Sequence, residues 1–153
     1  ILVAGRSGSA LAARIGTMKI NQEIDALKVM GIDPVRYLVA PPLIAMLIMV
    51  PCLTMMSNFV GLFLAGVYIN IELSLSLAAY LDGIIDILTV GDVLHGLGKS
   101  ALYAIEIAVI GVVNGAGVKG GAEGVGKATT QAVVQSISAI IVTAMIVVIV
   151  STM

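Results

Sequence analysis

The sequence predicts an all-α, polytopic helical membrane protein with three complete transmembrane helices, the end of an earlier one and a short cytoplasmic helix. No charged residue occurs from Tyr37 to Ile71 or from Ala128 to Met153, and Ser100 to Val118 contains only Glu106. A helix needs roughly 20 apolar residues to cross a bilayer core about 30 Å thick. Charged residues make up 11% of the chain and hydrophobic residues 59%, whereas a soluble domain has about 25% charged residues. Because backbone groups in lipid must be bonded within their own segment, these runs are predicted to be helices.

Composition also excludes several classes of function. The net charge is -1, so no basic surface indicates a nucleic-acid partner. Cys52 is the single cysteine, which excludes a disulfide framework, and the spacing of the other residues predicts no metal site. The sequence begins at Ile1 without a signal-peptide pattern, and we interpret it as the C-terminal part of a longer protein.

The distribution of charge divides the chain and orients it. We expect the end of an earlier span (1–17), a cytoplasmic segment (18–36), a span (37–69), a periplasmic connection (70–92), a span (93–115), a cytoplasmic Gly-rich loop (116–130) and a last span (131–153). Seven Lys and Arg residues lie in the first two segments and in the Gly-rich loop, whereas residues 70–92 contain four acidic residues and no basic one. Positive-inside bias therefore places the acidic connection outside.

A short amphipathic helix is expected at residues 22–30 of the cytoplasmic segment. Its apolar face has helical spacing and consists of Ile20, Ile24 and Leu27. Asn21 is the expected N-cap, and Gly31 stands where a helix commonly ends. Such a helix either lies on the lipid surface or docks in the groove of a cytoplasmic partner. Its mixed charge favours docking, because anionic lipid attracts faces rich in Lys and Arg.

Small residues recur every fourth position near the beginning of the chain. Gly8, Ala12 and Gly16 form one row, a second row lies beside it (Gly5, Ser9, Ala13), and Gly111 and Gly115 form a further pair. Rows of this kind let membrane helices approach closely. The spacing predicts intramembrane packing, either within one chain or across a dimer.

Two glycine patterns resemble nucleotide-binding motifs but lack the required context. Residues 115–120 match G-x-G-x-x-G, yet they follow a membrane span and no acidic residue occurs after Glu123. Residues 121–128 approach a P-loop, but Ala128 replaces the magnesium-binding Ser or Thr. We interpret the segment as a Gly-rich turn that contacts a partner or moves, with Gly120, Gly121, Glu123, Gly124, Gly126 and Lys127 as its candidate functional residues.

Glu106 is the only charged residue in the apolar run from Ser100 to Val118 and is therefore a candidate functional site. The structural alternative is a protonated Glu that is hydrogen-bonded to a neighbouring helix through Ser, Thr or Asn. No spacing in the sequence indicates catalytic residues, and the chain is predicted not to be an enzyme.

Residues 16–41 (GTMKINQEIDALKVMGIDPVRYLVAP) closely resemble the signature of the MlaE-type, or YrbE, permeases. Residues 120–130 (GGAEGVGKATT) resemble a second signature of that family, and residues 4–10 (AGRSGSA) also fit. The resemblance covers essentially the whole chain. It implies the membrane subunit of an ABC transporter, in the cell inner membrane, that moves phospholipid or related lipids and serves outer-membrane lipid asymmetry.

The resemblance also implies partners and roles. The helix at 22–30 corresponds to a coupling helix that contacts a cytoplasmic ABC ATPase, with Glu23, Ile24, Asp25, Leu27, Lys28, Met30 and Gly31 as coupling residues. The permease would be a homodimer working with a periplasmic MCE-domain protein and often with a STAS-domain subunit. This chain would hold no cofactor, because ATP and Mg would be bound by the ATPase. Two alternatives remain open, namely an ion-coupled secondary transporter that uses Glu106 and a structural scaffold for an MCE ring.

Overall fold

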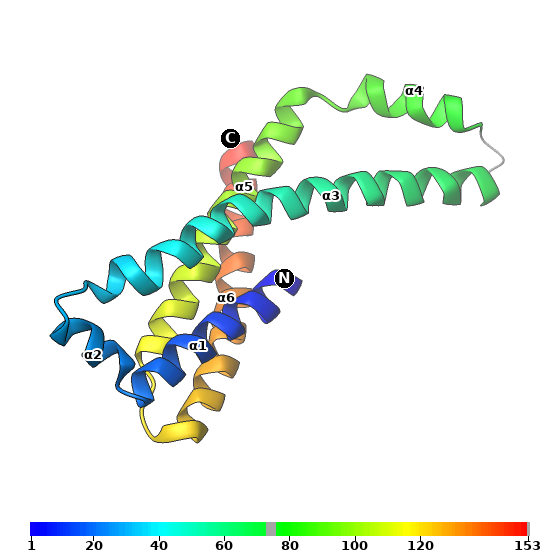
Figure 1. Cartoon of the computed structure of the whole chain (residues 1–153). Helices are drawn as coiled ribbons and strands as arrows, with labels where there is room; N and C mark the ends of the chain where they lie inside the picture. Colours follow the sequence, from blue (N-terminus) through cyan, green and yellow to red (C-terminus); the bar gives the residue numbers. More distant parts are fainter. Residues whose placement is uncertain (73–75, 153) are drawn as a thin grey trace. The chain divides into compact units, whose positions relative to one another are not determined.

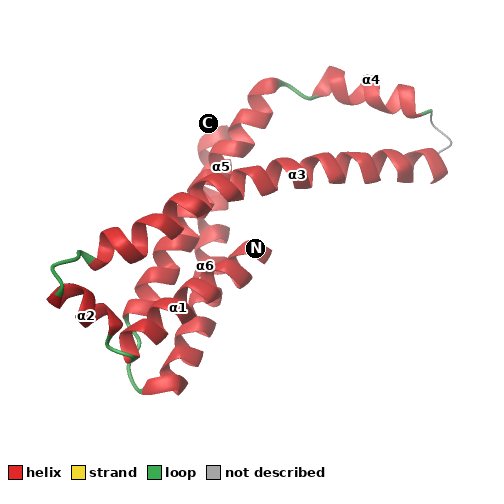
Figure 2. Cartoon of the chain, in the orientation of Figure 1, coloured by secondary structure: helices red, strands yellow, loops and turns green. Residues whose placement is uncertain are grey.

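The computed structural model describes residues 1–72 and 76–152, and their regular structure is entirely helical (Figures 1 and 2). The helices are α1 (Ser9–Ile20), α2 (Glu23–Val29), α3 (Ala40–Glu72), α4 (Leu77–Ile87), α5 (Val90–Ala116) and α6 (Gly121–Thr152). Two π-helical turns, η1 (Ala4–Gly8) and η2 (Val35–Val39), lead directly into α1 and α3. The all-α prediction is confirmed. Residues 73–75 of the expected connection and Met153 of the last expected span lie outside the described residues.

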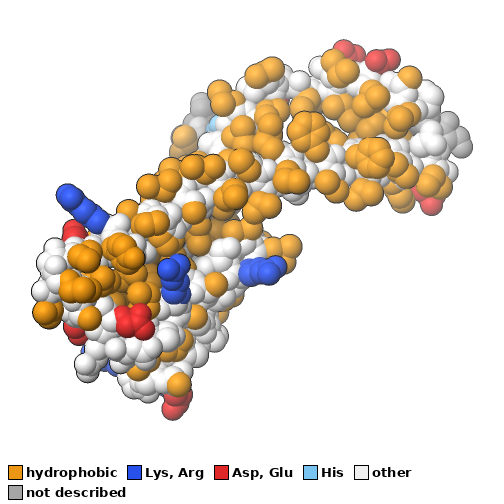
Figure 3. All heavy atoms as spheres, viewed as in Figure 1, with side chains coloured by type: hydrophobic (Ala, Val, Ile, Leu, Met, Phe, Trp, Pro, Cys, Tyr) orange, Lys and Arg blue, Asp and Glu red, His pale blue; other side chains and the backbone are white. Residues whose placement is uncertain are grey.

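Within residues 1–72 and 76–152, three helical stretches are long and apolar enough to cross a membrane: Val35–Glu72, Val90–Ala116 and Gly121–Val150. Each extends beyond the bounds expected from the sequence at one end or both. Apolar side chains remain exposed along α3, including Phe59, Phe63 and Tyr68, and Figure 3 shows hydrophobic side chains, in orange, over much of the surface of the molecule. A helix that is apolar on all sides is typical of a membrane span. This surface is suited to lipid or to the apolar surface of another helix.

The chain packs as two units, and α3 and α5 each pass through both of them. One unit comprises Ile1–Leu47 and Tyr103–Met153, and the other comprises Ile48–Leu102. In the first unit, Ala4, Ile107 and Ile140 form a buried core, and Met46 and Tyr103 pack against it. This core joins the beginning of the chain, the start of α3, and α5 and α6.

The close approach of α1 to α5 depends on glycines in the first unit. A Cβ atom at Gly115 would lie 2.8 Å from the carbonyl O of Ala12 and 2.8 Å from Cβ of Ile15. A Cβ at Gly111 would lie 3.0 Å from the carbonyl O of Gly8. The predicted row Gly8–Ala12–Gly16 therefore packs within the chain against the predicted pair on α5. The second row (Gly5, Ser9, Ala13) is only half-buried, and a Cβ at Gly5 would meet nothing within 4 Å.

The second unit contains a helix that the sequence analysis did not predict. Residues 77–87 of the acidic connection expected at 70–92 form α4, whose N-cap Ser76 accepts a hydrogen bond from Ala79 N at 3.3 Å. The Tyr80 hydroxyl donates to the carbonyl O of Leu62 on α3 at 3.0 Å. A Cβ at Gly66 would lie 2.8 Å from the Tyr80 ring, so this glycine admits the ring against α3. The capping serine was a signal for this helix, but the acidic residues suggested a simple connection.

The glycine contact predicts a site-specific effect on stability. In the protein in its membrane-mimetic environment, Gly115→Leu should lower the stability by about 1–3 kcal/mol, because overpacking forces the backbones of α1 and α5 apart. The measurement is equilibrium unfolding in mixed micelles. Gly98→Leu on the same helix is the matched control, because a Cβ at Gly98 meets nothing within 4 Å. Equal losses in the two variants would contradict this account of the packing.

Candidate functional site

The α2 segment is a single short helix with a well-defined end. Gly31 N donates to the carbonyl O of Lys28 at 3.0 Å, and Ile32 N donates to the carbonyl O of Leu27 at 3.0 Å. This pair of bonds is a Schellman motif, and it requires the left-handed backbone that Gly31 adopts (φ 75°). Gly31 therefore ends α2 as the sequence predicted.

The start of α2 differs from the prediction. Gln22, with φ 59°, is the flanking residue, and no side chain caps the helix. The amide of Asn21 instead donates to Glu23 Oε1 at 3.2 Å. Asn21 cannot act as the cap because the turn at Asn21 and Gln22 separates α1 from α2, and its backbone N continues the bonding of α1 to the carbonyl O of Thr17.

The expected coupling residues do not share one face. Ile24 and Leu27 are half-buried, so the predicted stripe is only partly exposed. The outward apolar residues are Met30, which is 64% exposed, and Val29, which is 89% exposed. The sequence analysis missed Val29, because it lies off the stripe that the spacing defined. The other four expected coupling residues are all exposed: the charged Glu23, Asp25 and Lys28, and the glycine Gly31.

The Gly-rich segment is mostly helix rather than the loop expected at 116–130. The chain reverses between Ala116 and Gly121, and α6 already begins at Gly121. Gly120 (φ 87°) and Gly121 (φ 75°) adopt backbone conformations that favour glycine, and this makes such a short reversal possible. Glu123, Gly124, Gly126 and Lys127 consequently lie on the first turns of α6.

This arrangement does not fit a nucleotide site. Both glycine motifs require a strand before the loop, whereas the helix α5 precedes it here. Lys127 lies 4.0 Å from Glu123 on the same helix, and both side chains are largely exposed. The segment is therefore a tight turn between two helices, with charged side chains at the start of α6.

Glu106 is held by the neighbouring helix. The Thr143 hydroxyl of α6 donates a hydrogen bond to Glu106 Oε1. Glu106 Oε2 is buried, and the described residues provide no hydrogen-bond partner for it. Ser136 Oγ, also on α6, is likewise buried without a hydrogen-bond partner among the described residues. The first contact is the interhelical bond that the structural interpretation of Glu106 predicts, and the second oxygen is an unpaired polar atom within a span.

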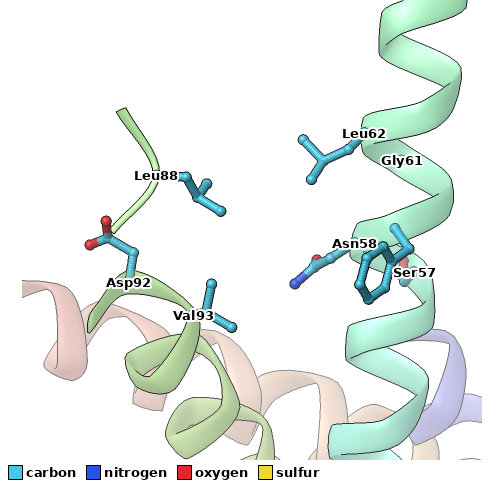
Figure 4. A pocket seen from close by; sticks show the side chains of 8 residues that line it. Ser57, Asn58, Gly61, Leu62, Leu88, Asp92 and Val93 are labelled. Atoms are coloured by element: carbon cyan, nitrogen blue, oxygen red, sulfur yellow. The ribbon is translucent and has the colours of Figure 1, made fainter. Parts of the chain in front are cut away.

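A cavity of about 490 Å³ lies within the second unit, between α3 and the beginning of α5 (Figure 4). Leu88 and Val93 point across it toward Asn58 and Leu62 of α3. The carboxylate of Asp92 points away from α3 and accepts from Thr89 N at 3.1 Å. The walls of the cavity are therefore mostly apolar, with the amide of Asn58 on one side. Its lining residues do not form a catalytic arrangement of nucleophile, acid and base. Among the described residues, no group of His, Cys, Asp and Glu could hold a metal ion.

Comparison with known proteins gives consistent matches along the chain. The family model described as Permease MlaE matches residues 1–150. A "Probable ABC transporter permease protein" of Rickettsia typhi is 40% identical over 139 residues, which are 89% of this chain and 52% of that protein. A protein of the same description from Synechocystis is 41% identical over 143 residues, covering 93% of this chain and 54% of the relative.

A plant relative is also similar. "Protein TRIGALACTOSYLDIACYLGLYCEROL 1, chloroplastic" of Arabidopsis thaliana is 37% identical over 142 residues, covering 93% of this chain and 41% of that protein. The chain thus spans about half the length of the curated relatives it matches.

The interhelical bond at Glu106 predicts which changes the span tolerates. Thr143→Val should lower the stability of the protein by about 0.6–1.7 kcal/mol, the range for polar contacts between membrane helices. Glu106→Gln should stay close to the wild type, because the amide oxygen still accepts from Thr143. Unfolding in mixed micelles measures both effects. Thr143→Ser keeps the hydroxyl and serves as the control. If it were as damaging as Thr143→Val, the hydrogen bond would not be the cause.

Proposed function

The chain belongs to the MlaE permease family, and from this premise we propose that it forms part of the membrane subunit of an ABC transporter for phospholipid or related lipids. It is a multi-pass membrane protein with three helices capable of spanning the bilayer. The proposed location is the inner membrane, with α2 and the turn before α6 in the cytoplasm. The basic residues near these segments and the acidic residues of 70–92 support this orientation.

The observation that carries the proposal is the form of α2. It is a single helix of seven residues, without a buried residue, between α1 and the start of α3. Val29 and Met30 direct apolar surface outward, and exposed Asp25 and Lys28 lie nearby, 3.3 Å apart. An apolar anchor surrounded by polar residues is suited to a groove on a protein partner. We propose that this partner is the ATPase subunit.

The proposed mechanism is mechanical. ATP and magnesium are bound and ATP is hydrolysed by the ATPase, and this chain acts as a non-catalytic subunit. Closure of two ATPase subunits displaces α2, and α2 passes the displacement to the spans. In a homodimer, this movement changes the space between the two permeases and moves lipid to or from a periplasmic MCE-domain protein. A STAS-domain subunit completes the assembly that we propose.

Two features support a lipid as the substrate. The exposed face of α3 is apolar along its length and offers no charged side chain between Tyr37 and Ile71. The name of the Arabidopsis relative contains the name of a glycolipid. A lipid is the substrate that can reach an apolar helix surface directly from the bilayer.

One observation favours a different driving force. Glu106 Oε2 is buried without a partner among the described residues, and an intramembrane carboxylate is a typical proton relay. A secondary transporter of this kind would need an ion gradient and no ATPase. A purely structural scaffold for an MCE ring would need neither. Lipid transfer by reconstituted permease, measured with ATPase and ATP or with a proton gradient alone, distinguishes the three functions.

Docking of α2 predicts a specific loss of assembly. In the full-length permease, Met30→Asp should weaken co-purification with the ATPase by about 30-fold, as expected for a charge placed at an anchor worth about 2 kcal/mol. The thermal stability of the permease should not change, because Met30 is exposed. Ile87→Asp is the control, because Ile87 is exposed at the end of α4. Unchanged assembly in Met30→Asp would exclude this surface as the contact.

The proposed orientation predicts a pattern of labelling. In a Cys52→Ala background, a cysteine introduced at Asp82 should react with an impermeant thiol reagent from outside intact cells. A cysteine at Glu123 should react only after the membrane is broken. Both positions are exposed, so access through the membrane decides the result. Reversed labelling would overturn the orientation and the role of α2.

A further inference from the structure

The last turn of α1 lies beside the turn that joins α5 to α6 (Figure 1). Lys19 Nζ donates a hydrogen bond to the carbonyl O of Ala116, the last residue of α5. One turn earlier, a Cβ at Gly16 would lie 2.8 Å from Val118 Cγ2 and 3.5 Å from Val125 Cγ2. All these residues belong to one packed unit. The end of α1 thus contacts both helices that flank the turn.

The hydrogen bond made by Lys19 has a clear electrostatic basis. The last carbonyl groups of a helix have no partner within that helix and carry a partial negative charge. An ammonium group satisfies one of them and interacts favourably with the helix dipole. Because the acceptor is a backbone atom, the bond fixes the end of α5 itself, whatever side chains surround it.

The same turn of α1 leads directly into α2. Asn21 N and Gln22 N donate to the carbonyls of Thr17 and Lys19 at 3.0 Å and 3.1 Å, so the connection continues the bonding of α1. α2 has no buried residue of its own. A displacement of α2 therefore reaches the rest of the chain at its N-terminal side through the turn that contains Lys19.

We infer that Lys19 is a positioning residue that transmits displacement of α2 to the adjoining ends of α5 and α6. The inference rests on the proposed function, because it assumes that a partner moves α2. The turn beyond Ala116 contains Gly120 and Gly121 at positive φ. These glycines allow the two helix ends to change their relative position when Lys19 moves Ala116.

The test uses the full-length permease, reconstituted with its ATPase in phospholipid vesicles. Lys19→Met keeps an unbranched side chain and removes the donor, whereas Lys19→Arg keeps a cationic donor. Arg14→Met is the matched control, since it removes a positive charge from an exposed position on the same helix. The readouts are lipid transferred per ATP hydrolysed, co-purification with the ATPase, and the melting temperature of the permease.

Lys19→Met should lower the lipid transferred per ATP by about 2- to 30-fold, the range in which residues along a coupling network act. Co-purification and melting temperature should match the wild type, Lys19→Arg should recover most of the transfer, and Arg14→Met should leave it unchanged. Wild-type behaviour of Lys19→Met would overturn the inference. So would equal loss in Lys19→Arg or Arg14→Met, or a loss that only parallels lower stability. If the wild-type permease itself neither binds the ATPase nor couples hydrolysis to transfer, the proposed function fails, and the inference fails with it.

Discussion

The contact between the backbones of α1 and α5 is the constraint on which the packing of the first unit depends. In a bilayer, helices gain little from hydrophobic association, because the lipid is as apolar as their side chains. Close approach then has to come from small residues, and Gly111 and Gly115 bring α5 onto the carbonyls of Gly8 and Ala12. This approach also places Gly16 against Val118 and Val125 and brings Lys19 within reach of Ala116. The position of the turn before α6 therefore follows from the glycines that precede it on α5.

The direction of α2 is determined at both of its ends. Gln22 precedes it with φ 59°, and Gly31 follows it with φ 75°. A left-handed backbone is costly for a residue with a Cβ and free for glycine. α2 is therefore a short rigid element between two defined turns, and its outward surface depends on those turns as much as on its own sequence. In the proposed transporter, this geometry makes α2 suitable for receiving a displacement.

Polar side chains within the apolar helices form hydrogen bonds within their own helix or with the neighbouring one. Within α3, Thr54 Oγ1 donates to the carbonyl O of Val50, one turn earlier, at 2.9 Å. Asn114 donates to the carbonyl O of Ile110 at 2.9 Å and to Gln135 Oε1 of α6 at 2.7 Å. With the bond between Thr143 and Glu106, two polar contacts join α5 to α6. They add directional contacts to an interface that otherwise consists of small and apolar side chains.

The sequence by itself determined the membrane class, the long apolar helices and the short helix that Gly31 ends, because these follow from local composition and backbone preference. Only the tertiary structure decided that the row containing Gly8 packs within the chain while the row containing Gly5 does not, since both have the same spacing. It also decided that Ile24 and Leu27 are half-buried, whereas Val29 and Met30 are exposed. Tertiary structure also decided what α6 and α4 pack against, namely Val125 of α6 against Gly16 and Tyr80 of α4 against Gly66. The partner of Lys19 lies at Ala116, far along the chain, and a contact between such distant positions is set by packing rather than by any local pattern.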